Sequence, residues 1–239
     1  MAAGRGERLR PLTDRWPKPV LPVDGRPVVA TLLRELAAAG FREAFVVVGH
    51  LGEQVQRLLG TGDGFGIRLR YAEQPVREGS ADAVARAVDA GARPPLLVTA
   101  ADTVYRPGDL ARARAEWESA AAAGALGVRR LAPPELRHQT AVEVRDGRVL
   151  AIGGAPASDE AGGALTGAPL WFLGETLAAR LEGLRGPPYE LADAVRAAIE
   201  AGEEVRAIEL GPTRDLTIAE DVIRRNFAYL WITGDERDV

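Results

Sequence analysis

The opening segment decides how this chain is interpreted: residues 2–19 read AAGRGERLRPLTDRWPKP. Gly4 and Gly6 free the backbone for a tight loop whose N–H groups can point at an anion. Arg8 adds a planar guanidinium that suits phosphate oxygens. Lys18 lies between two prolines, so its backbone has little freedom to lose when the side chain is positioned. Together these residues predict a phosphate-binding loop.

Lys18 is also the only lysine in the chain, although Lys and Arg together number 30. A flexible ammonium in a chain that otherwise carries its positive charge on arginine suggests a role that a guanidinium does not fill. Chance is the alternative, because a last remaining lysine must lie somewhere. The position beside the loop favours a function.

The composition limits the classes of function. A chain of 239 residues, 46% of them hydrophobic, is long enough for one large α/β domain or two small ones. The net charge of −4 argues against a nucleic-acid partner. The lack of cysteine and the presence of only two histidines argue against disulfides and zinc sites. No apolar run reaches the length of a membrane span. We therefore expect a cytoplasmic protein that acts on small molecules, alone or as a homo-oligomer.

The order of strands and helices predicts the fold class. Apolar periodicity predicts strands over residues 43–48, 67–72, 96–99, 124–131, 170–173 and 205–210. It predicts helices over residues 27–39, 51–59, 80–91, 109–123, 175–184, 190–200 and 218–229. Strands that alternate with helices indicate an α/β fold with a doubly wound, mostly parallel (mixed) sheet. Ligands of such sheets bind outside the carboxyl ends of the strands.

A hairpin interrupts this alternation in the second half. Asp146-Gly147 is a strong turn signal between strands predicted over residues 139–144 and 148–152. The chain has no internal repeat and no linker that would separate domains. We therefore expect residues 1–239 to form a single domain. Its Rossmann-like, nucleotide-binding half would span about residues 1–130, and a smaller lobe would be inserted in the second half, about residues 131–239.

A strand is missing before the opening loop. A phosphate loop of this kind normally follows a buried strand that aims it, whereas here the loop begins at Met1. We expect the reading frame to start further upstream and to encode a short apolar strand; the alternatives are a truncated chain and another segment that fills the place of the strand.

Three further positions are candidates for ligand contacts. The amide of Gln74 can donate and accept at once, as reading the edge of a nucleobase requires. Gly79 would let a base approach the backbone closely. Ser80 belongs to the same group, although an ordinary turn followed by a helix cap is the alternative interpretation.

Two carboxylates are candidates for a metal site. Asp102 follows an apolar strand, and Mg²⁺ takes one or two protein carboxylates together with phosphate oxygens and water. Asp215, far along the chain, could be a second ligand. The alternatives are a cap or turn residue at Asp102 and an exposed turn residue at Asp215.

Taken together, these segments resemble the sugar-1-phosphate nucleotidylyltransferases. That family opens with Ala-Ala-Gly-x-Gly, then Arg-Leu-x-Pro-Leu-Thr and Pro-Lys-Pro, and residues 2–19 match this signature, with Glu7 in place of the usual threonine. Gln74 and residues 79–81 resemble the family's Gln and Gly-Thr-Ala elements. Residues 101–102 resemble its Gly-Asp, and residues 214–221 its closing Asp-Ile-Gly-Thr-Pro-Glu-Asp.

The resemblance implies a reaction. A sugar 1-phosphate and a nucleoside triphosphate would give a nucleotide-sugar and pyrophosphate. Lys18 would neutralise the attacking phosphate and the α-phosphate, and Arg8 the leaving pyrophosphate. Mg²⁺ would be the cofactor, on Asp102 and Asp215. The nucleotide would be bound by the loop and the base-reading segment, at Ala3, Gly4, Gly6, Gln74, Gly79 and Ser80.

The resemblance makes the inserted lobe and the rest of the second half, about residues 131–239, the acceptor-binding half, and this half departs from the family. The usual Glu-Lys-Pro after the hairpin is replaced by residues 152–156, which contain no lysine. Thr140 stands where the family commonly has glycine, and Gly167 and Glu190 match the family's acceptor motifs only loosely; these three are our acceptor candidates. UTP or dTTP with a hexose 1-phosphate is the expected pair. The alternatives are CTP with a polyol, inositol or choline phosphate, and a non-catalytic homologue that senses nucleotide-sugars.

Overall fold

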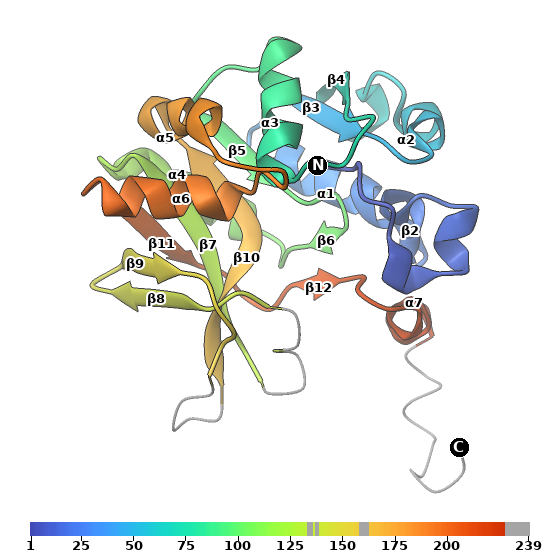
Figure 1. The fold of residues 1–239 in the computed structure, drawn as a ribbon. Helices are drawn as coiled ribbons and strands as arrows, with labels where there is room; N and C mark the ends of the chain where they lie inside the picture. Colours follow the sequence, from blue (N-terminus) through green and yellow to red (C-terminus); the bar gives the residue numbers. More distant parts are fainter. Residues whose placement is uncertain (133–135, 137–138, 158–162, 228–239) are drawn as a thin grey trace, which may run out of the picture.

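The computed structural model describes residues 1–132, 136, 139–157 and 163–227 (Figure 1). A six-stranded mixed sheet runs through the molecule in the order β5-β10-β7-β11-β9-β8. Its strands are β5 (Leu96–Thr99), β7 (Gly124–Leu131), β8 (Val142–Arg145), β9 (Arg148–Ile152), β10 (Ala164–Leu173) and β11 (Val205–Glu209). A separate parallel pair is formed by β3 (Glu43–Val48) and β4 (Arg68–Glu73).

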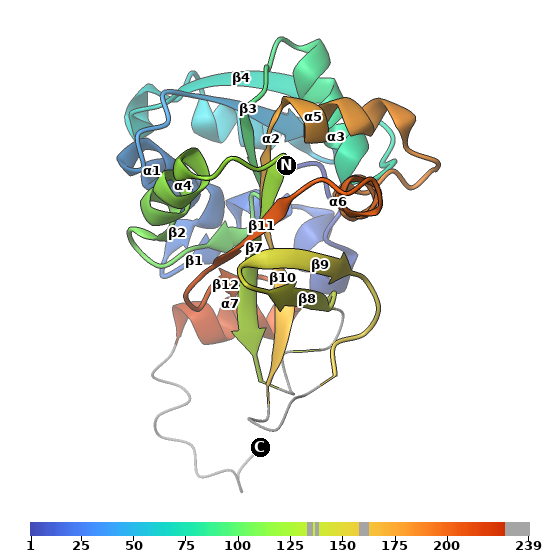
Figure 2. The same ribbon diagram turned by 90° about the vertical axis from the view of Figure 1, so that its left-hand side faces the viewer.

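Two layers of helices cover the two faces of this sheet (Figure 2). One layer contains α1 (Val28–Ala38) and α4 (Asp109–Ser119), and the other contains α3 (Ser80–Asp89), α5 (Glu175–Ala179) and α6 (Leu191–Glu200). Successive side chains of β7 pack on opposite faces of the sheet. Ala125 belongs to the core under α1 and α4, and Leu126 to the core under α3 and α6. This is the alternation that a strand buried on both faces requires.

Shorter elements complete the fold at the edges. The segment before α1 forms a small hairpin of β1 (Pro22–Val23) and β2 (Arg26–Pro27), and α2 (Gly52–Leu59) follows β3. Near the carboxyl end of the chain, β12 (Arg214–Asp215) pairs with β6 (Thr103–Val104) and is followed by α7 (Ala219–Asn226). No helix among the described residues combines the length and apolarity needed to cross a membrane.

The mixed α/β fold expected from the sequence is confirmed, and the strand directions refine it. β5, β7 and β11 run in one direction, because β5 and β7 are both antiparallel to β10 and β11 is parallel to β7. β10 runs antiparallel to β7, and the connection between these two strands contains the antiparallel pair of β8 and β9. The two sequence halves therefore share one sheet.

Several boundaries differ from the prediction. The strand predicted over residues 170–173 is the end of β10, which begins at Ala164 and shifts register between Gly167 and Trp171. Pro169 has no N–H to donate to a ladder, so this part did not look like a strand. The helices predicted over 109–123 and 175–184 end at Ser119 and Ala179, the second being continued by a 3₁₀ turn.

The hairpin and the final helix are also shorter than predicted. The first strand of the hairpin begins at Val142, not at residue 139. The final helix ends at Asn226 with Phe227 as its C-cap, and residues 228–229 of the range predicted for it lie outside the described residues.

Met1 and Ala2 lie between β3 and β5 and continue the ladder of both strands. Ala2 forms a parallel bridge with Val48, and its N–H donates to Val47 O at 2.7 Å. The amino group of Met1 donates to Thr99 O at 2.8 Å, and the N–H of Ala101 donates to Met1 O at 2.9 Å. Beyond Met1, a largely apolar cavity of about 450 Å³ separates the two strands. The strand expected before the loop would take this place, and that expectation remains a prediction.

The amino group of Met1 is an unusual occupant of this apolar position. Burial lowers the pKa of this group from 8.0 to about 6, and the nearby carboxylate of Asp102 partly opposes the shift.

Candidate active site

The opening loop is shaped by Gly6 and Thr13. The hydroxyl of the buried Thr13 donates to Gly6 O at 2.8 Å. Gly6 has φ of +64°, and a Cβ there would lie 2.8 Å from Thr13 Cγ2. The glycine is therefore required by the loop itself.

The other part of the loop is open to a ligand. Ala3 is buried and lines a cavity, while Gly4 and Arg5 are exposed. The backbone N–H groups of residues 4–6 have no hydrogen-bond acceptor in the described part of the chain. A Cβ on Gly4 would meet nothing within 4 Å, so packing inside the chain does not explain this glycine. Three free N–H groups in a row are a suitable anion site.

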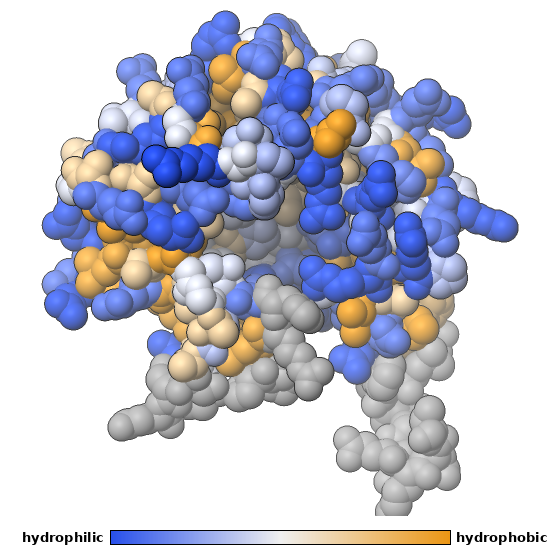
Figure 3. All heavy atoms as spheres, viewed as in Figure 1, coloured by the Kyte–Doolittle hydropathy of each residue, from blue (hydrophilic) through white to orange (hydrophobic). Residues whose placement is uncertain are grey.

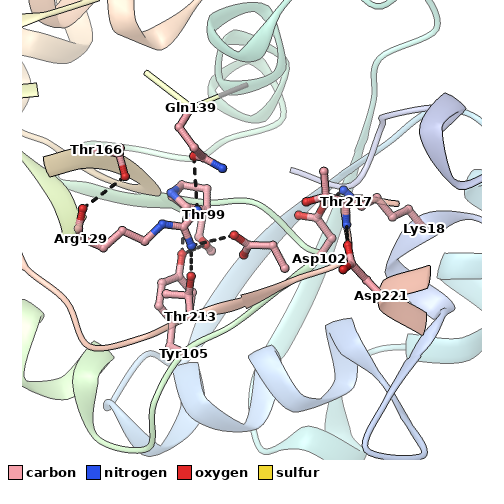
Figure 4. Close-up of polar contacts among 12 residues, drawn as sticks. Lys18, Thr99, Asp102, Tyr105, Arg129, Gln139, Thr166, Thr213, Thr217 and Asp221 are labelled. Carbon is pink, nitrogen blue, oxygen red and sulfur yellow. Dashed lines mark hydrogen bonds and ion pairs between the residues drawn. The ribbon is translucent and has the colours of Figure 1, made fainter. Parts of the chain in front are cut away.

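Arg8 and Lys18 stand on short 3₁₀ turns that flank the loop, Glu7–Leu9 and Lys18–Val20. Arg8 is exposed and pairs with no carboxylate among the described residues. Lys18 forms an ion pair with Asp102, which follows β5 (Figure 4). Both side chains are partly exposed, at 23% and 19%. The structure thus brings together the lysine and the first carboxylate that the sequence singled out.

The pairing of β12 with β6 places the backbone of Asp215 beside the segment that follows Asp102. Its Cα partner in that pair is Thr103, the residue after Asp102. The Asp215 side chain, however, pairs with Arg129 of β7, whose Nη1 lies 2.7 Å from Asp215 Oδ2. Each carboxylate therefore has a cation of its own.

These two carboxylates fit a magnesium ion. Asp215 Oδ1 is buried and has no hydrogen-bond partner in the described structure. Carboxylate oxygens are the ligands that Mg²⁺ prefers, and the ion usually takes one or two from the protein. No group of three or more His, Cys, Asp or Glu side chains placed to hold a metal occurs in the described ranges. The remaining ligands of such an ion would be phosphate oxygens and water.

Gln74 follows β4 and is fixed by two acceptors. Its Nε2 donates to Gly79 O at 2.9 Å and to Asp82 Oδ2 at 2.7 Å. Both amide hydrogens are thereby used, so Oε1 is left to accept from a ligand. Gln74 and Ala3 line an open cavity of about 1050 Å³. The centre of the face seen in Figure 1 is recessed and bordered by mostly hydrophilic residues (Figure 3).

Gly79, Ser80 and Glu190 meet one another. The N–H and hydroxyl of Ser80 both donate to Glu190 Oε2, at 3.1 and 2.5 Å, and the N–H of Leu191 donates to Ser80 Oγ at 2.9 Å. Ser80 and Glu190 thus satisfy the first N–H groups of α6 and α3. A Cβ on Gly79 would lie 2.2 Å from Tyr189 O, so the close backbone approach expected there is made by this chain itself.

The other two acceptor candidates lie side by side. The N–H of Gly167 donates to Thr140 O at 3.0 Å. A Cβ on Gly167 would make only an ordinary contact with Val142, at 3.6 Å, so packing does not require this glycine. Glu190 lies with Ser80 at the start of α3, not with this pair.

Sequence reasoning missed two groups of this site. Arg129 was overlooked because it continues an apolar strand, although a charge in such a strand is itself a signal. Asp221, part of the closing motif, accepts from the N–H groups of Thr217 and Ile218 at 2.7 and 2.9 Å and so begins α7 (Figure 4).

Comparison with known proteins identifies the family of this chain. The sequence pattern of the family described as "Nucleotidyl transferase" matches residues 1–212. A glucose-1-phosphate thymidylyltransferase of Streptomyces griseus is 30% identical over 242 residues, which cover 100% of this chain and 67% of that enzyme. An N-acetylmuramate alpha-1-phosphate uridylyltransferase of Neisseria meningitidis is 45% identical over 75 residues, 31% of this chain and 32% of that protein.

The fold has solved counterparts. The structure of a putative glucose-1-phosphate thymidylyltransferase from Bacillus anthracis, in complex with a sucrose, has a TM-score of 0.82 at 19% identity, covering 98% of this chain and 94% of that one. This likeness concerns the fold. With the match over residues 1–212, it leads to one conclusion: the chain belongs to the nucleotidyl transferase family, as its opening motif predicted.

Proposed function

We propose that this chain transfers a nucleoside monophosphate from a nucleoside triphosphate to a sugar 1-phosphate and releases pyrophosphate. The observation that carries the proposal is the meeting of Lys18 and Asp102, with Asp215 on the adjacent strand, beside a loop with free N–H groups. A cation, two carboxylates and an anion-binding loop are the groups that phosphoryl-type transfer needs.

The reaction needs no general base. An oxygen of the sugar phosphate, already an anion, attacks the α-phosphorus and forms the new P–O bond. The bond from the α-phosphorus to the bridging oxygen breaks, and pyrophosphate leaves with that electron pair. Catalysis then consists of positioning and electrostatic stabilisation.

Each group has a part in this scheme. The N–H groups of residues 4–6 bind the phosphates, and Arg8 neutralises the departing pyrophosphate. Lys18 neutralises the attacking phosphate and the α-phosphate, since its partly exposed and flexible side chain can turn from Asp102 to the substrates. Asp102 and Asp215 would hold a magnesium ion, which would supply further neutralisation of charge when bound.

The orientation of Gln74 supports a uridine or thymidine nucleotide. Its Oε1 accepts, and uracil and thymine offer an N3–H donor where cytosine has an acceptor. The relatives of this chain nevertheless include a 2-aminoethylphosphonate cytidylyltransferase, and the acceptor half lacks the family's lysine. A CTP-dependent transfer to a non-sugar phosphate is therefore the second candidate.

The acceptor is proposed to lie beside Thr140 and Gly167, two spatially adjacent residues of the acceptor half, because packing does not account for the glycine. Within the single domain, residues 1–130 would bind the nucleotide and residues 131–239 the acceptor. The cysteine-free composition supports a cytoplasmic enzyme whose partners are these small molecules, as a monomer or a homo-oligomer.

The test is a screen of donors against acceptors. UTP, dTTP and CTP are each combined with hexose 1-phosphates and with polyol, inositol and choline phosphates in the presence of Mg²⁺, and pyrophosphate release is measured. UTP or dTTP with a hexose 1-phosphate should give the highest kcat/KM. A preference for CTP and a non-sugar phosphate would establish the second candidate. Binding of nucleotide-sugars without release from any pair would indicate a sensor.

A further inference from the structure

Arg129 is the most confined cation of this region. Its side chain is 6% exposed, and its Nη1 contacts both Asp215 Oδ2 and the hydroxyl of Thr213. Its Nη2 lies 3.5 Å from Gln139 Oε1 (Figure 4). The backbone is held as well, because the buried Thr166 donates to Arg129 O at 3.2 Å. The guanidinium therefore has no room to turn to another partner.

This confinement acts on only one of the two oxygens of Asp215. Oδ2 is held by Arg129 at 2.7 Å, whereas Oδ1 is buried and without a donor in the described residues. A buried anionic oxygen is normally satisfied by a hydrogen bond, water or an ion. Asp215 lies opposite Thr103, the residue next to Asp102, so the two aspartates stand on paired segments of the chain.

We infer that Arg129 is a positioning residue for the metal site: it holds Asp215 Oδ2 so that Oδ1 faces a divalent cation shared with Asp102. The inference rests on the proposed function and deepens it. Arg129 itself touches neither the metal nor the substrates. A positively charged neighbour would by itself repel a cation, so simple electrostatics predicts that removing Arg129 strengthens metal binding. The positioning role predicts that removing Arg129 weakens it.

The test measures metal binding directly. Binding of Mn²⁺ is followed by electron paramagnetic resonance in the presence of a UTP analogue with a non-hydrolysable α,β-methylene bridge. We compare the wild type with Arg129→Gln and Arg129→Lys. Arg180→Gln is the matched control, because Arg180 forms a partly buried ion pair with Glu203 outside this site.

Arg129→Gln should weaken Mn²⁺ binding by about tenfold or more, the effect typical of a lost partner of a metal ligand. Arg129→Lys, which keeps the charge but not the planar fork, should fall between it and the wild type. Arg180→Gln should bind Mn²⁺ like the wild type. In turnover with Mg²⁺, kcat should fall in Arg129→Gln while KM for the triphosphate stays within about threefold, because the loop that binds the phosphates is unchanged.

Two results would overturn the inference, and they differ. Unchanged or tighter Mn²⁺ binding in both Arg129 variants, with a wild type that binds, would reject the role of Arg129 alone. A wild type that binds no Mn²⁺ beside the analogue would reject the metal site and the proposed reaction with it. If Arg129→Gln does not fold, the same comparison is made with Arg129→Lys.

Discussion

Two ion pairs hold the two carboxylates at the centre of this molecule, and their cations differ in freedom. Lys18 joins Asp102 from an open loop, and both side chains are about one fifth exposed, at 23% and 19%. Arg129 joins Asp215 from the middle of a sheet, where its side chain is 6% exposed and held by further partners. The same chemistry thus gives one cation that can change partner and one that keeps a carboxylate in place.

Removing the movable cation should have the largest effect. Lys18→Ala is expected to lower kcat by about a thousandfold, the loss typical of one preorganised charge at a transition state. Lys18→Arg should restore little, because a planar guanidinium cannot replace a compact ammonium. Thermal unfolding should change little in either variant, because the pair with Asp102 is partly exposed. Near-normal turnover in Lys18→Ala would contradict the catalytic role of Lys18, on which the comparison of the two cations depends.

The buried amino group of Met1, near Asp102, makes the stability of the protein depend on pH. The pKa of the Met1 amino group is lowered from 8.0 to about 6 by burial, so the unfolded chain binds more protons between these values. The free energy of unfolding should therefore rise by about 2 kcal/mol from pH 6 to pH 8. The free energy of unfolding is measured by urea denaturation at each pH. The protein used is one whose intact mass shows that Met1 is present.

The control for this prediction is a variant with a short apolar extension before Met1. The extension removes the free amine and can pair with β3 and β5, so stability should increase and its rise between pH 6 and pH 8 should disappear. A flat profile in the unextended protein would show that the amine is not buried.

The two carboxylates should differ in stability. Asp215→Asn leaves the buried Arg129 without a counter-charge and should lower the free energy of unfolding by about 2 kcal/mol. Asp102→Asn leaves only the partly exposed Lys18 and should cost less than about 1 kcal/mol. Urea denaturation of both variants at one pH measures the difference. Equal losses in the free energy of unfolding would contradict the difference in confinement between the Arg129 and Lys18 ion pairs.

The contrast between fixed and movable groups extends to the nucleotide pocket. Gln74, like Arg129, is held by two partners, so its free oxygen has a set direction. Gln74→Ala should reduce the preference for UTP over CTP in kcat/KM by about tenfold, the value of one or two hydrogen bonds. Gln56→Ala is the control, because Gln56 lines the same cavity. An unchanged preference would exclude Gln74 from base selection.

The fold could be predicted largely from local patterns. Apolar spacing located α1, β3 and β7, because a helix or strand buried in a core must repeat its apolar residues with its own period. The same reasoning missed the first part of β10, because Gly167 and Pro169 are residues that strands disfavour. It also predicted that Gly79 makes room for a nucleobase, whereas the backbone that lies close to Gly79 is that of Tyr189, far away in the sequence.

The sequence by itself determined the opening loop, the single lysine and the family to which the chain belongs, because these depend on neighbouring residues. Only the tertiary structure decided that Asp215 pairs with Arg129, that Ser80 meets Glu190 and that Met1 lies between β3 and β5. Such contacts follow from the order in which distant strands and helices pack. That order reflects the burial of the whole core, and no local pattern contains it.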